Sequence, residues 1–193
     1  MPTSENIAAS LPETGTLTYD DYVALTPPDS GDFELLDGYL IFMATPTPDH
    51  QDAVTELCAR MRLFASSRKL GKVFSAPLDV VFTPHDTLQP DILFIPAEGL
   101  HIIGDKKIEG APDLVVEVLS DSNKPKEQRY KKEIYESHGV REYWLINLEK
   151  ATVTVYQNRS GELVTAGVFK KNDLVSSDVL PGFEVRVSDL LNP

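Results

Sequence analysis

Cysteine and long apolar runs are nearly absent from this chain. Cys58 is the single cysteine among 193 residues, so no intramolecular disulfide can form, and its place in an amphipathic run indicates a small core residue. No stretch approaches the roughly 18 apolar residues of a transmembrane helix, and residues 1–15 lack the basic start and apolar centre of a secretory signal. We therefore expect a cytoplasmic protein without a membrane partner.

Basic side chains are also scarce. The sequence has 18 Lys and Arg against 30 Asp and Glu, which gives a formal net charge of −12. Such a field repels nucleic acid and excludes broad nonspecific binding, but it leaves room for a local basic groove. The cations gather in two sets, each of which is also compatible with a solvated helix face. The sets are Arg60, Arg62, Arg68, Lys69 and Lys72, and then Lys124, Lys126, Arg129, Lys131 and Lys132.

The length suits one domain, which we expect over residues 17–193 after a loose extension at 1–16. Apolar residues at helical spacing predict helices over 18–25, 50–70 and 126–138, the second of them ended by Gly71. Strands are predicted on both sides of a polar turn at 83–89, and the clearest hairpin signal is Asp37-Gly38. The predicted strands cover residues 33–36, 39–43, 72–82, 90–95, 112–120, 142–148, 152–157 and 163–169.

One predicted strand carries a charge at its centre. In the run 112–120, five apolar and mostly β-branched residues surround Glu117, as is typical of a central strand with helices on both faces. An unpaired ionised glutamate there is costly, so Glu117 needs a cationic partner, hydrogen bonds or a metal ion. The helix and strand that follow predict a crossover to a parallel neighbour. The pattern as a whole is that of an α/β protein.

Other carboxylates fall on neighbouring predicted strands. Asp91 lies near the start of the strand at 90–95, and Glu34 lies on the first arm of the hairpin. Several carboxylates near one point suit Mg²⁺, and a lysine such as Lys131 would stabilise the charge that develops in phosphodiester cleavage. Structural ion pairs among the same residues are the alternative that spacing alone leaves open.

Several motifs, taken in order, resemble those of the Uma2 family. They are Phe33–Gly38, the start of the helix at His50, Pro77–Val80, Gln89–Asp91, Pro112–Ser120, a basic helix with Lys131 and Tyr135, Gly139–Leu145 and Leu180–Phe183. The resemblance extends from about Thr18 to Leu191. It implies the restriction-endonuclease-like fold of the PD-(D/E)XK nuclease superfamily, a mixed central β-sheet flanked by helices. It also implies an endonuclease that uses Mg²⁺ or Mn²⁺ to cut DNA.

The resemblance assigns roles to individual acids. Asp91 and Glu117 match the two acids that bind the metal ion, and the backbone carbonyl of Val118 matches a third ligand. Glu34 matches an additional acid near the N-terminus, which binds the ion directly or through water. Together with a lysine, these residues form the expected catalytic set.

The lysine departs from the superfamily pattern. Leu119 occupies the usual position of the lysine, two residues after the acid, and Lys131 matches the place on the next helix to which Uma2-like sequences move it. The alternative is a surface lysine paired with Glu127. A Lys131 ammonium group near the acids would favour catalysis, whereas one in bulk solvent would remove this assignment.

Other polar and aromatic residues have a structural explanation beside a functional one. Asp79 either faces the same site or occupies a strand edge or turn, and His50 either approaches the site or hydrogen-bonds at its helix start. Asp113 is expected to cap or pair locally. The aromatic residues could stack on bases, although their spacing favours the core, and two polar residues could support the site. These are Tyr135, Tyr143 and Trp144, and then Glu127 and Gln128.

Two functions are compatible with these features. The first is a DNA endonuclease, with other nucleic acids left open, whose basic helix at 126–132 contacts phosphates and which forms a homodimer by analogy with enzymes that cut both strands. The second is a nuclease fold that has lost activity and serves as a binding or regulatory module, suggested by Leu119 and the net charge. Retention of all three acids speaks against the second, because a scaffold has no evident need to keep them together.

Overall fold

The computed structural model describes residues 16–27, 32–119 and 125–191, so the expected N-terminal extension falls almost wholly outside it. The helices are α2 (Tyr19–Leu25), α3 (Pro48–Arg68) and α4 (Pro125–Ser137), with 3₁₀ turns η1 (Ala97–Ile102) and η2 (Val187–Asp189). The strands are β1 (Phe33–Leu36), β2 (Tyr39–Phe42), β3 (Gly71–Ser75), β4 (Val80–Thr83), β5 (Asp86–Leu88), β6 (Ile92–Pro96), β7 (Ile108–Glu109), β8 (Leu114–Leu119), β9 (Glu142–Asn147), β10 (Thr152–Arg159), β11 (Glu162–Lys170), β12 (Leu174–Ser176) and β13 (Glu184–Arg186).

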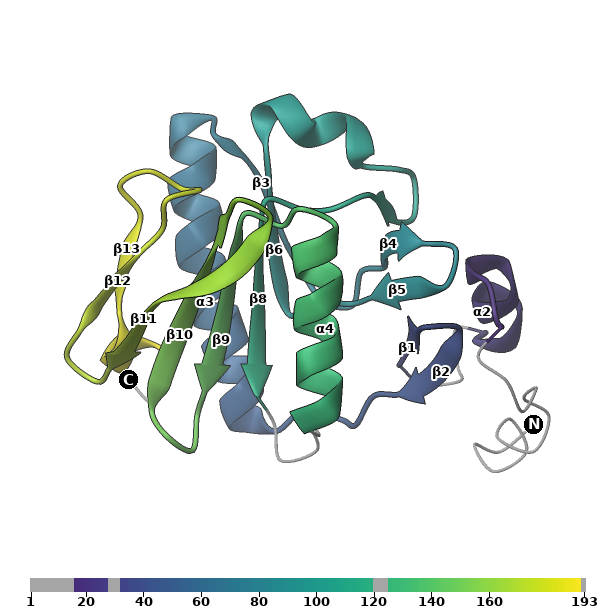
Figure 1. Ribbon diagram of the computed structural model, residues 1–193. Coiled ribbons are helices and arrows are strands. Elements are labelled where there is room, and N and C mark those ends of the chain that lie inside the picture. Colours follow the sequence, from purple (N-terminus) through teal and green to yellow (C-terminus); the bar gives the residue numbers. More distant parts are fainter. Residues whose placement is uncertain (1–15, 28–31, 120–124, 192–193) are drawn as a thin grey trace.

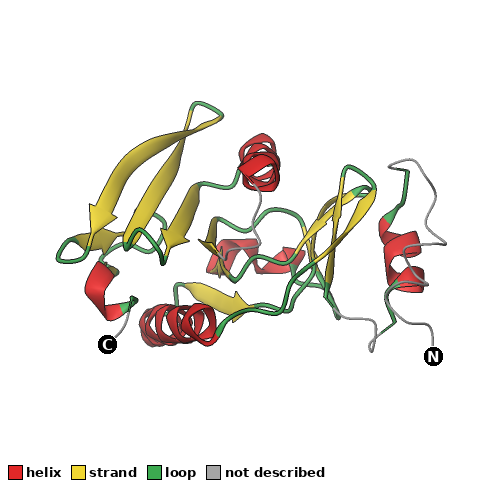
Figure 2. Cartoon of the chain, turned by 90° about the horizontal axis from the view of Figure 1, so that it is seen from below, coloured by secondary structure: helices red, strands yellow, loops and turns green. Residues whose placement is uncertain are grey.

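A mixed six-stranded sheet forms the centre of the structure, in the order β11-β10-β9-β8-β6-β3. The β8 and β9 strands are parallel, as predicted for a strand, helix and strand in succession, while the other neighbours are antiparallel. Figure 2 shows α3 on one face of this sheet and α4 on the other. The prediction of a mixed α/β sheet flanked by helices is confirmed.

Residue alternation along the central strands supplies one core to each face. Toward α3, Val116 and Trp144 pack with Leu57 and Met61, and the C-terminal segment adds Phe183. Toward α4, the intervening positions of the same strands pack with the helix and with the second sheet. The latter include Leu93, Val115, Ile134, Tyr135 and Tyr143. Glu117 is two residues from Val115 and therefore points to the α4 face.

A second, five-stranded sheet was not predicted. Its order is β2-β1-β5-β4-β7, and it lies beside the six-stranded sheet with α4 close to both (Figure 1). The predicted polar turn at 83–89 is wrong, because β5 pairs with both β1 and β4 and buries Thr87 and Leu88. The predicted strand at 72–82 is in fact two strands, β3 and β4, which belong to different sheets.

Local chemistry explains most of the element boundaries. The Thr18 side chain and Asp21 form a reciprocal capping box at the start of α2, and the Thr47 hydroxyl accepts a hydrogen bond from the His50 amide at the start of α3. The α3 helix ends before the predicted stop at Gly71, because Lys69 takes a left-handed conformation with φ 57°. Gly71 instead opens β3, where an added Cβ would lie 2.1 Å from the Ile95 carbonyl oxygen.

Candidate active site

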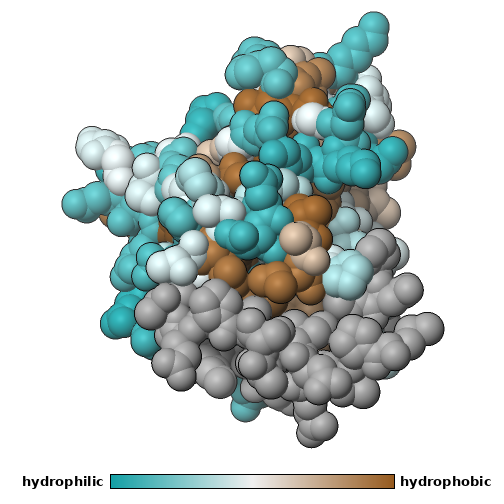
Figure 3. Space-filling model, turned by 90° about the vertical axis from the view of Figure 1, so that its right-hand side faces the viewer, coloured by the Kyte–Doolittle hydropathy of each residue, from teal (hydrophilic) through white to brown (hydrophobic). Residues whose placement is uncertain are grey.

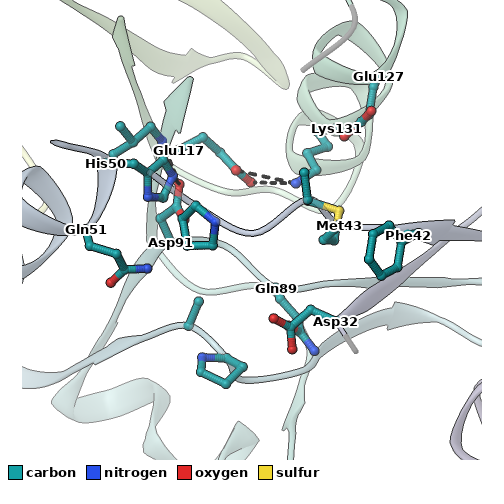
Figure 4. A pocket seen from close by; sticks show the side chains of 15 residues that line it. Asp32, Phe42, Met43, His50, Gln51, Gln89, Asp91, Glu117, Glu127 and Lys131 are labelled. Carbon is teal, nitrogen blue, oxygen red and sulfur yellow. Dashed lines mark hydrogen bonds and ion pairs between the residues drawn. The ribbon is translucent and has the colours of Figure 1, made fainter. Parts of the chain in front are cut away.

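A cavity of about 180 Å³ opens where α3, α4 and the two sheets meet. Four of the five residues expected to bind metal or act in catalysis line it: Asp91 just before β6, Glu117 and Val118 on β8, and Lys131 on α4. His50, from the first turn of α3, also lines it. Figure 4 shows Glu117, Lys131, His50 and Asp91 pointing toward one another.

Glu117 receives the partner that its burial requires. The Lys131 ammonium lies 3.4 Å from each Glu117 carboxylate oxygen and donates to the Glu34 Oε1 atom at 2.8 Å. The Tyr135 hydroxyl also donates to Glu117. Because Lys131 is only 2% exposed, the alternative of a surface lysine is wrong. Lys131 and Tyr135 are four residues apart on one face of α4, and this spacing could have linked both to Glu117.

Opposing effects set the ionisation of this cluster. Burial raises the pKa of Glu117 to about 7, although the neighbouring Lys131 lowers it. Burial would lower the pKa of Lys131, but the carboxylates of Glu117 and Glu34 outweigh burial and raise it above its ordinary value. Lys131 is therefore a permanent cation, while Glu117 is poised to titrate near neutral pH.

Glu34 lies behind the lysine and not in the wall of the cavity. It is fully buried on β1, where one carboxylate oxygen accepts from Lys131 and from the Gln89 amide at 2.9 Å. Its other oxygen, Oε2, has no hydrogen-bond partner among the described residues. Direct contact between Glu34 and an ion in the cavity would require the Lys131 ammonium to move.

Asp91 is held by donors from two directions. The Val118 amide donates to its Oδ2 atom at 2.7 Å, and His50 Nε2 lies 3.3 Å from the same oxygen. Burial lowers the pKa of His50, but Asp91 more than compensates, and the net shift is upward. His50 therefore takes both of its expected roles, because its side chain approaches the site while its backbone amide hydrogen-bonds at the start of α3. Since both donors use Oδ2, the other Asp91 oxygen takes no part in these contacts.

The remaining candidates divide between structure and site. Asp79 accepts from the Tyr19 and Tyr22 hydroxyls and from Gln89, and it does not line the cavity. Asp113 pairs locally with Arg141 at 2.7 Å, as expected. The three aromatic residues Tyr135, Tyr143 and Trp144 all belong to the core, also as expected. Glu127 lines the cavity, whereas Gln128 does not.

Four residues of the two basic sets make surface contacts. On α4, Arg129 lies 3.7 Å from Glu133 and Lys132 lies 3.1 Å from Glu136, both one turn away. In the other set, Arg60 pairs with Glu56 and Asp189, and Arg68 covers the Phe64 ring. Lys126 is exposed, and Lys124 lies outside the described residues.

A hard divalent cation is compatible with the oxygen atoms in this cavity. The described residues contain no group of three or more His, Cys, Asp or Glu side chains arranged to hold a metal ion. Mg²⁺, however, commonly uses only one or two carboxylates and completes its shell with water and substrate phosphates. Asp91 and Glu117 supply such carboxylates, and Val118 lines the same cavity, so the donor chemistry fits the ion.

The mixed sheet flanked by helices is a restriction-endonuclease-like α/β fold. The chain belongs to the Uma2 family, whose sequence model, described as "Putative restriction endonuclease", matches residues 19–188. The structure is similar to the crystal structure of "a putative nuclease belonging to DUF820" from Anabaena variabilis ATCC 29413, with a TM-score of 0.76, 22% identity, and coverage of 91% of this chain and 97% of that one. No curated protein matches the sequence.

Proposed function

We propose that the protein is an endonuclease that hydrolyses DNA phosphodiester bonds with Mg²⁺ or Mn²⁺. The observation that carries the proposal is the gathering of Asp91, Glu117, Val118 and a buried Lys131 at one open cavity. Family membership supports it. The single cysteine and the absence, among the described helices, of one long and apolar enough to span a membrane are compatible with a cytoplasmic setting.

The proposed roles follow from position and charge. Asp91, Glu117 and Val118 would hold the ion, which when bound lowers the pKa of a water molecule and neutralises charge on the phosphate. Lys131 presents a cation at the cavity wall and stabilises negative charge that develops on the phosphoryl oxygens. Glu34 fixes the Lys131 side chain from behind through the 2.8 Å contact. His50 restrains the orientation of Asp91.

A cleavage assay tests the proposal. Wild-type protein and the Asp91→Asn and Glu117→Gln variants are incubated with supercoiled and single-stranded DNA in Mg²⁺, in Mn²⁺ and in chelator. We expect metal-dependent cutting by the wild type, and a loss of at least about 100-fold in each variant. Asp113→Asn is the matched control, because that carboxylate pairs with Arg141 and does not line the cavity. Equal activity in Asp91→Asn and Asp113→Asn would contradict the proposed centre.

The second candidate function is a DNA-binding module without hydrolytic activity. It is favoured by Leu119 at the usual lysine position and by the engagement of Lys131 with two carboxylates. DNA binding by the wild type with no cutting under any metal condition would select this function. Sedimentation with and without duplex would test the homodimer that two-strand cleavage implies.

A further inference from the structure

A second cavity of about 440 Å³ lies between the β1–β2 hairpin and α4. The hairpin contributes Leu36, Asp37, Tyr39 and Ile41, and the helix contributes Lys126, Glu127, Arg129, Tyr130 and Glu133. We call this cavity the hairpin groove. Glu127 lines both the groove and the candidate active site, so the two hollows adjoin across the first turn of α4.

Aromatic surface is exposed along this path. Tyr39 in the groove is 51% exposed, and Phe42, on the same strand but in the wall of the active-site cavity, is 59% exposed. Figure 3 shows apolar side chains among hydrophilic ones on the side of the molecule that carries the hairpin. The Tyr130 ring is fixed by its hydroxyl, which donates to Asp86 at 3.2 Å. Exposed aromatic rings beside a polar cavity are typical of a binding surface.

The charges that line the hairpin groove favour the base of a nucleotide over its phosphate. The acids Asp37, Glu127 and Glu133 outnumber the cations Lys126 and Arg129, so the interior is unsuited to a phosphate. Carboxylates can accept hydrogen bonds from the N–H groups at the edge of a base. Lys126 is exposed and lines the groove next to Glu127, the residue that the groove shares with the active-site cavity, so it can meet a phosphate there.

We propose that the hairpin groove binds an unpaired nucleobase of the substrate strand, stacked on Tyr39, next to the nucleotide whose phosphate enters the active site. The proposal rests on the proposed nuclease function and deepens it by substrate class. The preferred substrate is single-stranded DNA or a duplex with an unpaired base, because a base within an intact stack cannot enter the groove. Tyr39 contributes its ring face, and Lys126 neutralises the phosphate that joins this nucleotide to the next.

A binding assay in chelator, where hydrolysis cannot occur, tests this proposal separately from catalysis. The probes are three oligonucleotides that carry 2-aminopurine: a single strand, a duplex in which that base is unpaired, and a fully paired duplex. The wild type should bind the first two more tightly than the third and change the fluorescence of the base on stacking. Tyr39→Ala should weaken binding of the first two by roughly 5- to 100-fold, whereas Tyr39→Phe should retain it.

Leu174→Ala is the control, since Leu174 is a 49% exposed apolar residue on β12, outside the groove. Equal affinity for the three probes, unchanged by Tyr39→Ala, would overturn the groove proposal while leaving the nuclease proposal intact. Absence of binding to any probe would overturn the groove proposal, and cleavage would then decide the nuclease proposal. A dimer that dissociates in Tyr39→Ala, with base binding unaltered, would instead assign the groove to a second copy of the chain.

Discussion

Replacement of Lys131 by methionine should destabilise the protein more than any exposed lysine replacement. The change keeps the length of the side chain but leaves two acids, Glu34 at 0% and Glu117 at 7% exposure, without their shared cation. Removal of one partner from a buried ion pair costs about 3–5 kcal/mol. For a chain of this size, that loss corresponds to a fall of roughly 6–20 °C in Tm.

Urea unfolding at about pH 8 and thermal melts measure the effect, with Lys126→Met on the same helix as the control. The exposed Lys126 should change stability by no more than about 0.5 kcal/mol. A triple variant, Lys131→Met with Glu34→Gln and Glu117→Gln, should regain most of the loss, because no buried charge then lacks a partner. Equal stability of Lys131→Met and the wild type would refute the view that this lysine neutralises buried acids.

Three further predictions concern titration, metal and salt. The pKa of Glu117 is about 7 in the folded protein and near 4.5 in the unfolded chain, so ionisation of this group lowers the free energy of unfolding as pH rises between these values. Between about pH 5 and about pH 8, the free energy of unfolding of Glu117→Gln should therefore rise by about 1–3 kcal/mol relative to that of the wild type, as measured by urea unfolding at each pH. A difference between the two proteins that does not change with pH would contradict the raised pKa. Millimolar Mg²⁺ or Mn²⁺ should raise the Tm of the wild type but not of Asp91→Asn, and a matching rise in both would exclude Asp91 as a ligand. Lys126→Ala should reduce the slope of log affinity for duplex DNA against log salt by about 0.9, and an unchanged slope would remove Lys126 from the interface.

Much of the fold could be predicted because local signals and tertiary packing agree. The Asp37-Gly38 turn, the capping of α2 by Thr18 and the parallel pair around α4 all follow from short-range chemistry. The assembly of the second sheet could not be predicted beyond the β1–β2 hairpin, because its strands are short and two of its pairings join distant parts of the chain. For example, Leu35 pairs with Thr87, and β4 pairs with β7. Such pairings depend on tertiary contacts that propensity does not report.

The candidate site could also be predicted only in part. The requirement of Glu117 for a partner followed from its sequence alone, and the structure supplies Lys131 and Tyr135. The contact of His50 with Asp91 depends on how α3 meets the start of β6, which no spacing within either segment reveals. Sequence reasoning likewise placed Glu34 among the acids, but only the arrangement of the two sheets shows that it lies behind the lysine.

The position of Lys131 between the two sheets affects which residues a relative without activity could replace and remain stable. Glu34 belongs to the five-stranded sheet and Glu117 to the six-stranded sheet, so the lysine is also a tether between them. A relative without nuclease activity would still lose stability if Lys131 were replaced, because Glu34 and Glu117 would lose their shared cation. A scaffold therefore has a structural reason to keep this lysine. The Asp91 side chain is held by His50 of α3 and by the Val118 amide of β8, both on the side of the six-stranded sheet. Under the proposed function, its replacement would therefore remove hydrolysis with less effect on stability.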